Sequence, residues 1–255
     1  MRRIRDCLRA VAAMVSQRNL KEICRIHAHE VNPSTALDRE IDRLIFSTLP
    51  RSDEGWLSEE SIDSTNRLCM SRIWIVDPID GTREFVQEIP EWSVSIALIE
   101  EHTAVAGGVL NPSTGEMFLG SMETGLEVES PSTLNRYKKD AQGSCLLVSR
   151  REYRERKWEV SAQTNLHIVP IGSIAYRMAR VAAGCADATC TFEPRSEWDI
   201  AGGVALVHAA GGRVQAGDGS PIRFNKPVPL VNGVVALGGN CDSLVPTLSE
   251  IGMRS

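Results

Sequence analysis

The stretch Trp74–Phe85, W-I-V-D-P-I-D-G-T-R-E-F, sets the interpretation of the whole chain. It opens with aromatic and β-branched residues typical of a strand, which Pro78 and Gly81 bring to an end. Asp77 and Asp80 therefore leave the strand end together. Carboxylates without Cys or His nearby suit a hard divalent cation, Mg²⁺ more than Zn²⁺. The alternative is an Asp-Pro turn in which the second Asp accepts backbone hydrogen bonds.

A helix is predicted directly after Gly81, with Asp80 or Thr82 as its N-cap and Glu84 in its first turn. The free N–H groups of a helix start point outward and attract anions. This arrangement suits a phosphate group beside a metal ion.

The composition is that of an ordinary globular protein. With 255 residues, 42% of them hydrophobic, the chain can bury a substantial core in one large domain or two intimate ones. The net charge of -5 argues against nucleic acid as an obligate partner. Seven scattered cysteines without a C-x-x-C pair are expected to be reduced thiols, which favours a cytoplasmic protein. We expect neither a signal peptide nor a membrane span.

Helices dominate the start of the chain and strands its middle. Apolar residues recur at helical spacing over residues 2–28 and 36–49. An antiparallel meander is predicted from three strand-like runs, at residues 92–100, 103–112 and 116–120.

A soft domain boundary is predicted near residue 140. Residues 120–142 are polar and poorly patterned, and a strand begins again at Ser144–Ser149. We therefore divide one compact unit into residues 1–140, with most of the acidic motifs, and residues 141–255, an α/β half.

Further acids stand where helices or loops begin. Asp38 and Asp199 lie in the predicted first turns of helices, where an acid complements the helix dipole. Asp199 opens a helix of small residues that can approach its neighbours closely. Glu59 and Glu60 follow a short apolar run and are typical of a solvated loop. Taken alone, each acid has this simple explanation.

A charged helical run covers residues 151–159. A solvated helix face explains it, but its cations and the arginine before it could also form a basic wall for an anionic substrate: Arg150, Arg151, Arg154, Arg156 and Lys157. Further on, Gly172 and Ser173 open a helix and offer N–H groups to a ligand, unless capping is their whole role.

Three motifs occur in order: S-E-E at 58–60, D-P-I-D-G-T at 77–82, and W-D-I-A-G-G at 198–203 with A-A-G-G after it. They resemble the motifs of the inositol monophosphatase superfamily, and the resemblance covers residues 34–240. It implies a Mg²⁺-dependent, typically lithium-sensitive phosphatase that forms a homodimer. It also implies a mixed α/β (α+β) fold, a layered α/β/α/β/α sandwich, which agrees with the elements predicted above.

The resemblance implies a metal site. Glu59 matches the family's metal-binding glutamate, with Glu60 as the alternative, and Asp77 matches the residue that bridges metal ions. The remaining ligands are the backbone carbonyl of Ile79 and the carboxylates of Asp80 and Asp199. We expect two or three Mg²⁺ ions, because clustered acids repel one another without cations.

Catalytic and substrate-binding roles also follow from the resemblance. Thr82 matches a hydroxyl that helps to orient the attacking water, Asp38 matches the acid behind it, and Glu59 completes the catalytic set. The implied substrate contacts are Asp80, Gly81, Thr82, Gly172, Ser173 and Asp199. The N–H groups of Gly81 and Thr82 would hold the phosphate of a small phosphorylated substrate.

The loop before Asp38 departs from the family. Members commonly carry a lysine there, whereas this chain reads H-A-H-E-V-N-P-S-T-A-L-D from His27 to Asp38. The missing lysine bears on loop closure and on the weakest metal site. His27 and His29 either take its place or lie at the surface.

The motifs point to two candidate substrates. T-R-E-F at 82–85 and S-E-W-D at 196–199 are closer to 3′(2′),5′-bisphosphate nucleotidases, which hydrolyse adenosine 3′,5′-bisphosphate, and we favour this branch. G-V-L-N-P-S-T-G-E-M-F at 108–118 is closer to inositol monophosphatases. Fructose-1,6-bisphosphate and histidinol phosphate phosphatases stay open. Since some relatives serve as transcription or ribosome-assembly partners, a non-catalytic binding role is the alternative from another class.

Overall fold

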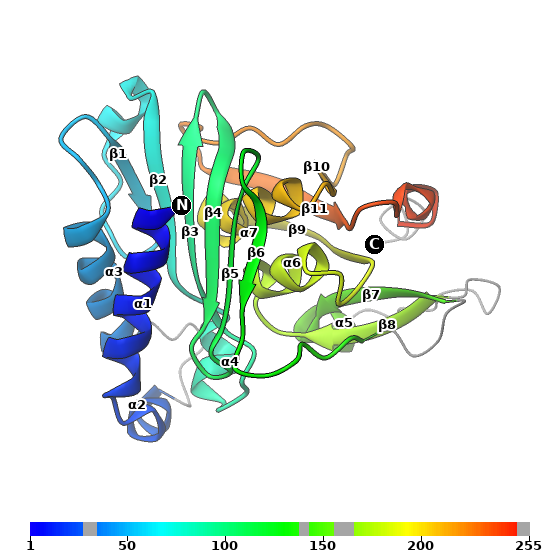
Figure 1. The fold of residues 1–255 in the computed structure, drawn as a ribbon, viewed down its shortest axis with the longest axis horizontal. Helices are drawn as coiled ribbons and strands as arrows, with labels where there is room; N and C mark the ends of the chain where they lie inside the picture. Colours follow the sequence, from blue (N-terminus) through cyan, green and yellow to red (C-terminus); the bar gives the residue numbers. More distant parts are fainter. Residues whose placement is uncertain (28–34, 138–142, 156–165, 249–255) are drawn as a thin grey trace.

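The computed structural model describes residues 1–27, 35–137, 143–155 and 166–248, in which layers of helices and sheets alternate (Figure 1). The first layer contains the N-terminal helices: α1 (Arg2–Ser16), α2 (Leu20–His27) and α3 (Ala36–Thr48). Both predicted helical regions are confirmed, the first of them as two helices. The apolar faces of α1 and α3 pack against one side of the first sheet, with Leu8 and Ile41 fully buried.

The first sheet has the strand order β1-β2-β3-β4-β5-β6. Its strands are β1 (Gly55–Ser58), β2 (Arg72–Asp80), β3 (Ser93–Glu100), β4 (Thr103–Asn111), β5 (Glu116–Ser121) and β6 (Gly125–Glu129). β1 and β2 run parallel, and the other neighbours are antiparallel, so the predicted meander is confirmed. Strand β6 was not predicted, because this edge strand is only partly buried and its sequence is therefore polar.

The second sheet has the order β10-β11-β9-β7-β8. Its strands are β7 (Ser144–Ser149), β8 (Leu166–Ile171), β9 (Ala188–Ser196), β10 (Arg213–Ala216) and β11 (Leu230–Leu237). Side chains of β7 alternate between two cores. Cys145 and Leu147 pack with α6, whereas Leu146 and Val148 pack with the C-terminal Leu248. The sheet is therefore covered on both faces.

The layer between the sheets consists of α6 (Ile174–Ala182) and α7 (Glu197–Ala209). The prediction that α7 approaches its neighbours closely is confirmed. A Cβ on Gly202 would lie 2.4 Å from the Oγ of Ser95 on β3, and one on Gly203 would lie 2.6 Å from the Cβ of Met178 on α6. Because no side chain fits at either position, α7 is held tightly against both sheet and helix, which fixes the direction of its N-terminus.

The predicted boundary near residue 140 falls outside the described residues. The two sheets divide on either side of it, yet α7 from the second half packs on β3 and β4 from the first. The division into 1–140 and 141–255 stays a prediction. In the described ranges, no helix combines the length and the apolar character that crossing a bilayer requires.

Candidate active site

The parallel pair β1 and β2 brings the first two acids together. Ser58 pairs with Val76 in the ladder, so the residues that follow, Glu59 and Asp77, leave neighbouring strands at the same edge of the sheet. Pro78 lacks an N–H, and the pairing of β2 with β3 shifts register immediately after Asp77. The backbone therefore leaves the regular β-ladder at the point where the two carboxylates emerge.

The chain then turns at Gly81 into the short helix α4 (Thr82–Val86). Gly81 has a φ of 89°, in the left-handed region that glycine adopts without strain, and it is the N-cap residue. The prediction that Asp80 or Thr82 caps this helix is wrong. The Thr82 hydroxyl donates instead to the carbonyl oxygen of Ile79 at 3.0 Å, because the turn brings that carbonyl back beside the helix start.

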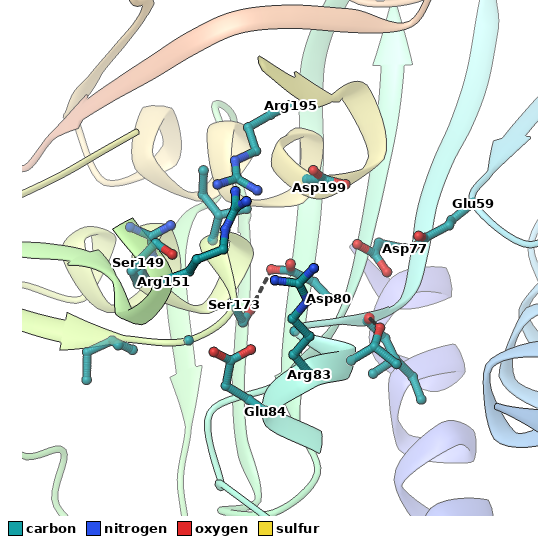
Figure 2. Close-up of a pocket in the computed structure, with 17 residues that line it drawn as sticks. Glu59, Asp77, Asp80, Arg83, Glu84, Ser149, Arg151, Ser173, Arg195 and Asp199 are labelled. Carbon is teal, nitrogen blue, oxygen red and sulfur yellow. Dashed lines mark hydrogen bonds between the residues drawn. The ribbon is translucent and has the colours of Figure 1, made fainter. Parts of the chain in front are cut away.

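Asp80 is bound to the start of α6. Its Oδ2 accepts from the Ser173 hydroxyl at 2.5 Å (Figure 2) and from the N–H of Ala175 at 2.7 Å. Ser173 is also the N-cap of α6, where its hydroxyl accepts from the N–H of Tyr176 at 3.0 Å. Since Oδ2 is used in this way, a metal ion would meet the other oxygen of Asp80, Oδ1.

Gly172 lies beside this helix start for a steric reason. A Cβ there would lie 2.4 Å from the Cγ of Glu84, and the Gly172 N–H donates to Glu91 at 2.8 Å. Gly172 therefore lines the cavity without offering its N–H to a ligand.

Asp199 enters from the second half of the chain as the third residue of α7. Its Oδ2 accepts from the N–H of Ser196 at 3.3 Å, as expected of an acid in a first turn. Burial raises the pKa of Asp199 to about 7, and the nearby charge of Asp80 adds to the rise while Arg195 opposes it.

A cavity of about 490 Å³ collects most of the predicted site residues: Glu59, Asp77, Ile79, Asp80, Gly81, Thr82, Gly172, Ser173 and Asp199. Asp38 is not in its lining. The Asp38 carboxylate accepts from the N–H and the hydroxyl of Thr35, at 2.8 and 2.5 Å, as the third helical residue of a capping box in which Thr35 is the N-cap of α3. Within the described part of the chain, no hydrogen bond joins Asp38 to Thr82. Residues 28–34 of the preceding loop, His29 included, lie outside that part.

The acids of the cavity disfavour one another's charge. Burial raises the pKa of Asp77 well above its usual value, and the charges of Glu59 and Asp80 raise it further. Part of the Glu59 side chain is exposed to solvent, but its carboxyl group is desolvated. This desolvation, together with the charge of Asp199, raises the pKa of Glu59 to about 8. Burial also raises the pKa of Asp38 to about 6. The charge of Arg195 opposes the rise at Asp80 and Asp199, yet the pKa values of both stay above their usual range.

The donors suit a hard cation. Asp77 is 1% exposed, and its Oδ1 is buried without a hydrogen-bond partner in the described residues, which is costly unless a cation or proton meets it. Within the described ranges, no three Asp, Glu, His or Cys side chains stand in the arrangement of a metal site. Because Mg²⁺ keeps several waters and takes few carboxylates, this oxygen set fits it.

The predicted basic wall is present in part. Arg151 lines the cavity, whereas Arg150 is held away by Glu91 through two hydrogen bonds of 2.6 Å. Arg154 is exposed on α5 (Arg150–Glu155). Two members lie outside the described residues: Arg156 and Lys157.

Two arginines that sequence analysis did not single out complete the opposite end of the cavity, Arg177 on α6 and Arg195 on β9. Helical spacing offered a signal only for Arg177, since Arg195 lies on a strand. Arg177 follows Ser173 by four residues, on the same helix face.

An alternating sandwich with converging carboxylates at a strand-to-helix junction defines a metal-dependent phosphatase. The model of the inositol monophosphatase family matches residues 4–251, and the chain belongs to this family of phosphatases acting on phosphate monoesters.

Its relatives carry several names. The chain is 31% identical over 205 residues to the 3′(2′),5′-bisphosphate nucleotidase CysQ of Salmonella typhimurium (79% of this chain, 83% of the relative). It is 29% identical over 232 residues to a fructose-1,6-bisphosphatase/inositol-1-monophosphatase of Thermotoga maritima (85% and 82%). It is also 30% identical over 216 residues to the Nus factor SuhB of Xylella fastidiosa (80% and 77%).

Solved structures share the fold. CysQ from Bacteroides thetaiotaomicron superposes with a TM-score of 0.65 at 26% identity, over 90% of this chain and 97% of that one. An inositol monophosphatase of Thermotoga maritima gives 0.69 at 25% identity, over 92% and 94%. The predicted fold class is therefore confirmed.

Proposed function

We propose that this protein is a Mg²⁺-dependent phosphatase that hydrolyses a 3′,5′-bisphosphate nucleotide with an activated water molecule. The observation that carries the proposal is the group of four acids in one cavity, Glu59, Asp77, Asp80 and Asp199, whose charges oppose one another. A phosphate ester adds more negative charge, so the site can bind its substrate only if cations accompany it.

We propose that two or three Mg²⁺ ions are held by these acids and by the carbonyl of Ile79. Asp77 is the central ligand, because its Oδ1 is buried and unpartnered in the described residues. When bound, the ions lower the pKa of water, neutralise the phosphate and stabilise the leaving oxygen.

The remaining polar groups position the reactants. Thr82 lines the cavity, where its hydroxyl can orient the attacking water. The role of Asp38 behind Thr82 stays a prediction, because its carboxylate is bound to Thr35. The N–H groups of Gly81 and Thr82, at the start of α4, would hold the phosphate. Catalysis of this kind depends on orientation and charge more than on covalent chemistry.

Adenosine 3′,5′-bisphosphate is the proposed substrate, with inositol 1-phosphate as the alternative. The likeness to CysQ and the arginines of the cavity support the first, and the likeness to an inositol-1-monophosphatase supports the second. The name Nus factor of the SuhB relative keeps a role in a transcription or ribosome complex as an added possibility. We further propose a cytoplasmic homodimer that needs neither a membrane nor nucleic acid.

The test is Mg²⁺-dependent phosphate release from both esters. We expect release from wild type that stops with a chelator, and none from Asp77→Asn, while the exposed control Asp242→Asn stays active. Full activity of Asp77→Asn would overturn the assignment of Asp77 as a metal ligand. A preference for inositol 1-phosphate of about tenfold, about 1.4 kcal/mol in transition-state binding, would make it the proposed substrate in place of adenosine 3′,5′-bisphosphate.

A further inference from the structure

The cavity has two ends of opposite charge. Figure 2 shows Glu59 and Asp77 at one end, and Ser149, Arg151 and Arg195 at the other. The proposed metal site accounts for the acidic end. The basic end lies on α5, α6 and β9, outside the strand-to-helix junction, and the hydrolysis of a phosphate group does not by itself require it.

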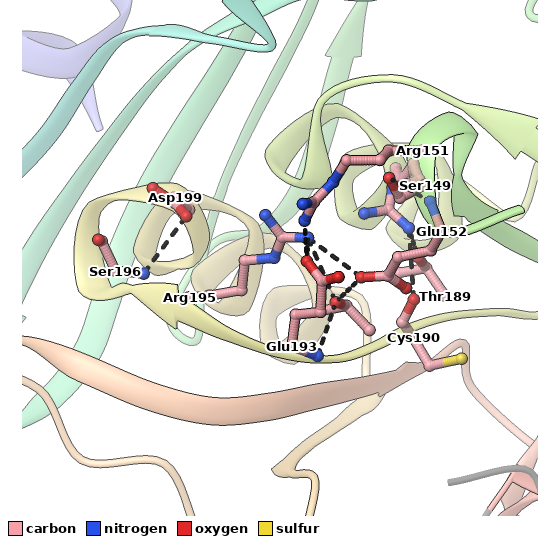
Figure 3. A network of polar contacts seen from close by, with 11 residues as sticks. Ser149, Arg151, Glu152, Thr189, Cys190, Glu193, Arg195, Ser196 and Asp199 are labelled. Carbon is pink, nitrogen blue, oxygen red and sulfur yellow. Dashed lines mark hydrogen bonds and ion pairs between the residues drawn. The ribbon is translucent and has the colours of Figure 1, made fainter. Parts of the chain in front are cut away.

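A polar network holds the basic end together (Figure 3). Arg151 pairs with Glu193. Arg195 donates to Glu152 at 3.2 Å and to Thr191 at 3.3 Å. These contacts raise the alternative that the arginines only neutralise acids of the protein.

Arg177 does not fit that alternative. It is 2% exposed, and its contacts are two long hydrogen bonds of 3.3 Å to neutral acceptors, the Thr189 hydroxyl and the Cys190 carbonyl. Its Nε is buried without a partner in the described residues, and so is the Nε of Arg195. Burial and the like charge of Arg195 lower the pKa of Arg177 to about 10, although the charges of Glu152 and Asp80 oppose the fall. A buried cation in such surroundings is costly until an anion meets it.

A fourth cation stands at the mouth. Arg83 follows directly on the phosphate-facing turn, is exposed, and makes no ion pair within the described residues. Figure 2 shows its side chain reaching over Asp80, toward the middle of the cavity. Its guanidinium is therefore open to a ligand that spans the two ends.

We propose that Arg177 and Arg195, with Arg151 and Arg83 around them, bind a second phosphate group of the substrate while the first lies at the acidic end. This inference rests on the proposed phosphatase function and names the residues that set its specificity. Guanidinium groups match phosphate oxygens through paired, charge-assisted hydrogen bonds. A substrate whose second end is a neutral polyol leaves these donors unpaired, and sites with unpaired buried polar groups reject such analogues.

The first experiment changes only the ligand and needs no variant. Adenosine 3′,5′-bisphosphate and adenosine 3′-monophosphate share the group to be hydrolysed and differ in the 5′-phosphate. We expect the wild-type kcat/KM to be about tenfold to a hundredfold higher for the bisphosphate. A ratio near one overturns the inference and leaves the phosphatase function standing.

A binding measurement separates the inference from the proposed function. Calorimetry in metal-free buffer compares adenosine 5′-monophosphate with adenosine, and needs no turnover. We expect the monophosphate to bind at least about tenfold more tightly. Equal binding of the two overturns the subsite, whether or not the protein hydrolyses any ester.

Variants then assign the residues. Arg177→Gln should reduce the bisphosphate preference at least about tenfold, mainly through KM, with a melting temperature equal to or above that of wild type because an uncompensated charge is removed. Arg83→Gln, at the surface, should reduce the preference about threefold and keeps the test valid if the buried variant fails to fold. Arg213→Gln, on β10 with a 59% exposed side chain, is the matched control. An unchanged preference in folded Arg83→Gln and Arg177→Gln overturns the assignment.

Discussion

Buried acids occur in two regions of this molecule with opposite electrostatics. Glu54 lies beneath α1, where burial alone would raise its pKa, but hydrogen bonds from Arg3 at 2.6 Å and from Trp74 at 2.8 Å lower the pKa to about 2. In the candidate active site, burial raises the pKa of Asp77 and Asp199, and neighbouring acids raise it further.

The counter-cation makes the difference. Two buried acids outside the site have an arginine built into the fold: Glu54 has Arg3 at 2.6 Å, and Glu116 has Arg180 at 2.8 Å. Asp77 instead keeps an unpartnered oxygen within the described residues. The contrast indicates that the fold satisfies its own buried charges and leaves those of the site for a ligand to satisfy.

The largest effect is expected in the site. Asp77→Asn should lower Mg²⁺-dependent kcat/KM about 10⁴-fold, or about 5 kcal/mol, because the central ligand of the cations is lost. The metal-free variant should nevertheless melt higher than metal-free wild type, since one repelling charge is gone. Phosphate-release kinetics and calorimetric melting measure both. A lower melting temperature would mean that Asp77 is a structural acid like Glu54.

At the buried pair of Glu116 and Arg180, removing one charge should destabilise the fold instead of stabilising it. Arg180→Leu removes the guanidinium from Glu116 and should lower the free energy of unfolding by about 3 to 5 kcal/mol, measured by urea denaturation. Activity per folded molecule should stay near that of wild type. A loss below about 1 kcal/mol, similar to the Arg213→Gln control, contradicts the account of this pair.

Low pH should destabilise the fold through the protonation of Glu54. The folded-state pKa of Glu54, about 2, lies below its ordinary value, so the stability it contributes is present above about pH 4.5 and is lost as pH falls toward 2. We expect Glu54→Gln to remove about 2 kcal/mol from the difference in unfolding free energy between pH 5 and pH 2.5. An identical pH dependence in wild type and variant would contradict the assigned pKa.

The smallest effect is expected from the site acids on the alkaline side. Their folded-state pKa values are raised, to about 7 for Asp199, so metal-free protein should lose stability as pH rises through neutrality. Melting curves at pH 5 and pH 8 with a chelator should show the loss, and Mg²⁺ should reverse it. A melting temperature that rises over this range in metal-free protein would break the comparison.

The sequence sufficed to predict the acidic end of the cavity. Glu59 and Asp199 were added to this site by the resemblance of their motifs to those of the family, whereas Asp77 and Asp80 were placed together because the local sequence puts both at one strand end. The helices, the meander and the close approach of α7 were predictable for the same reason, since each depends on local periodicity or on glycine.

The basic end was not predicted, because it depends on tertiary contacts. Arg177 on α6 and Arg195 on β9 meet only when the second sheet packs beneath the helix layer. The sequence does not distinguish Arg150 from Arg151, because the hydrogen bond that holds Arg150 away from the cavity is accepted by the distant Glu91. The same holds for Asp38. Its hydrogen bonds to Thr35 follow from capping, but its distance from Thr82 depends on how α3 rests on the sheet.

The most direct test of the central claim is a calorimetric titration of metal-free protein with Mg²⁺ at pH 7, repeated in two buffers of different ionisation enthalpy. Because Glu59 and Asp199 have pKa values of about 8 and about 7, they are partly protonated before the ions arrive. We predict saturable Mg²⁺ binding with proton release in wild type, and neither in Asp77→Asn. Absence of Mg²⁺ binding, or equal binding by the variant, would contradict the claim that this acid cluster is a cation site.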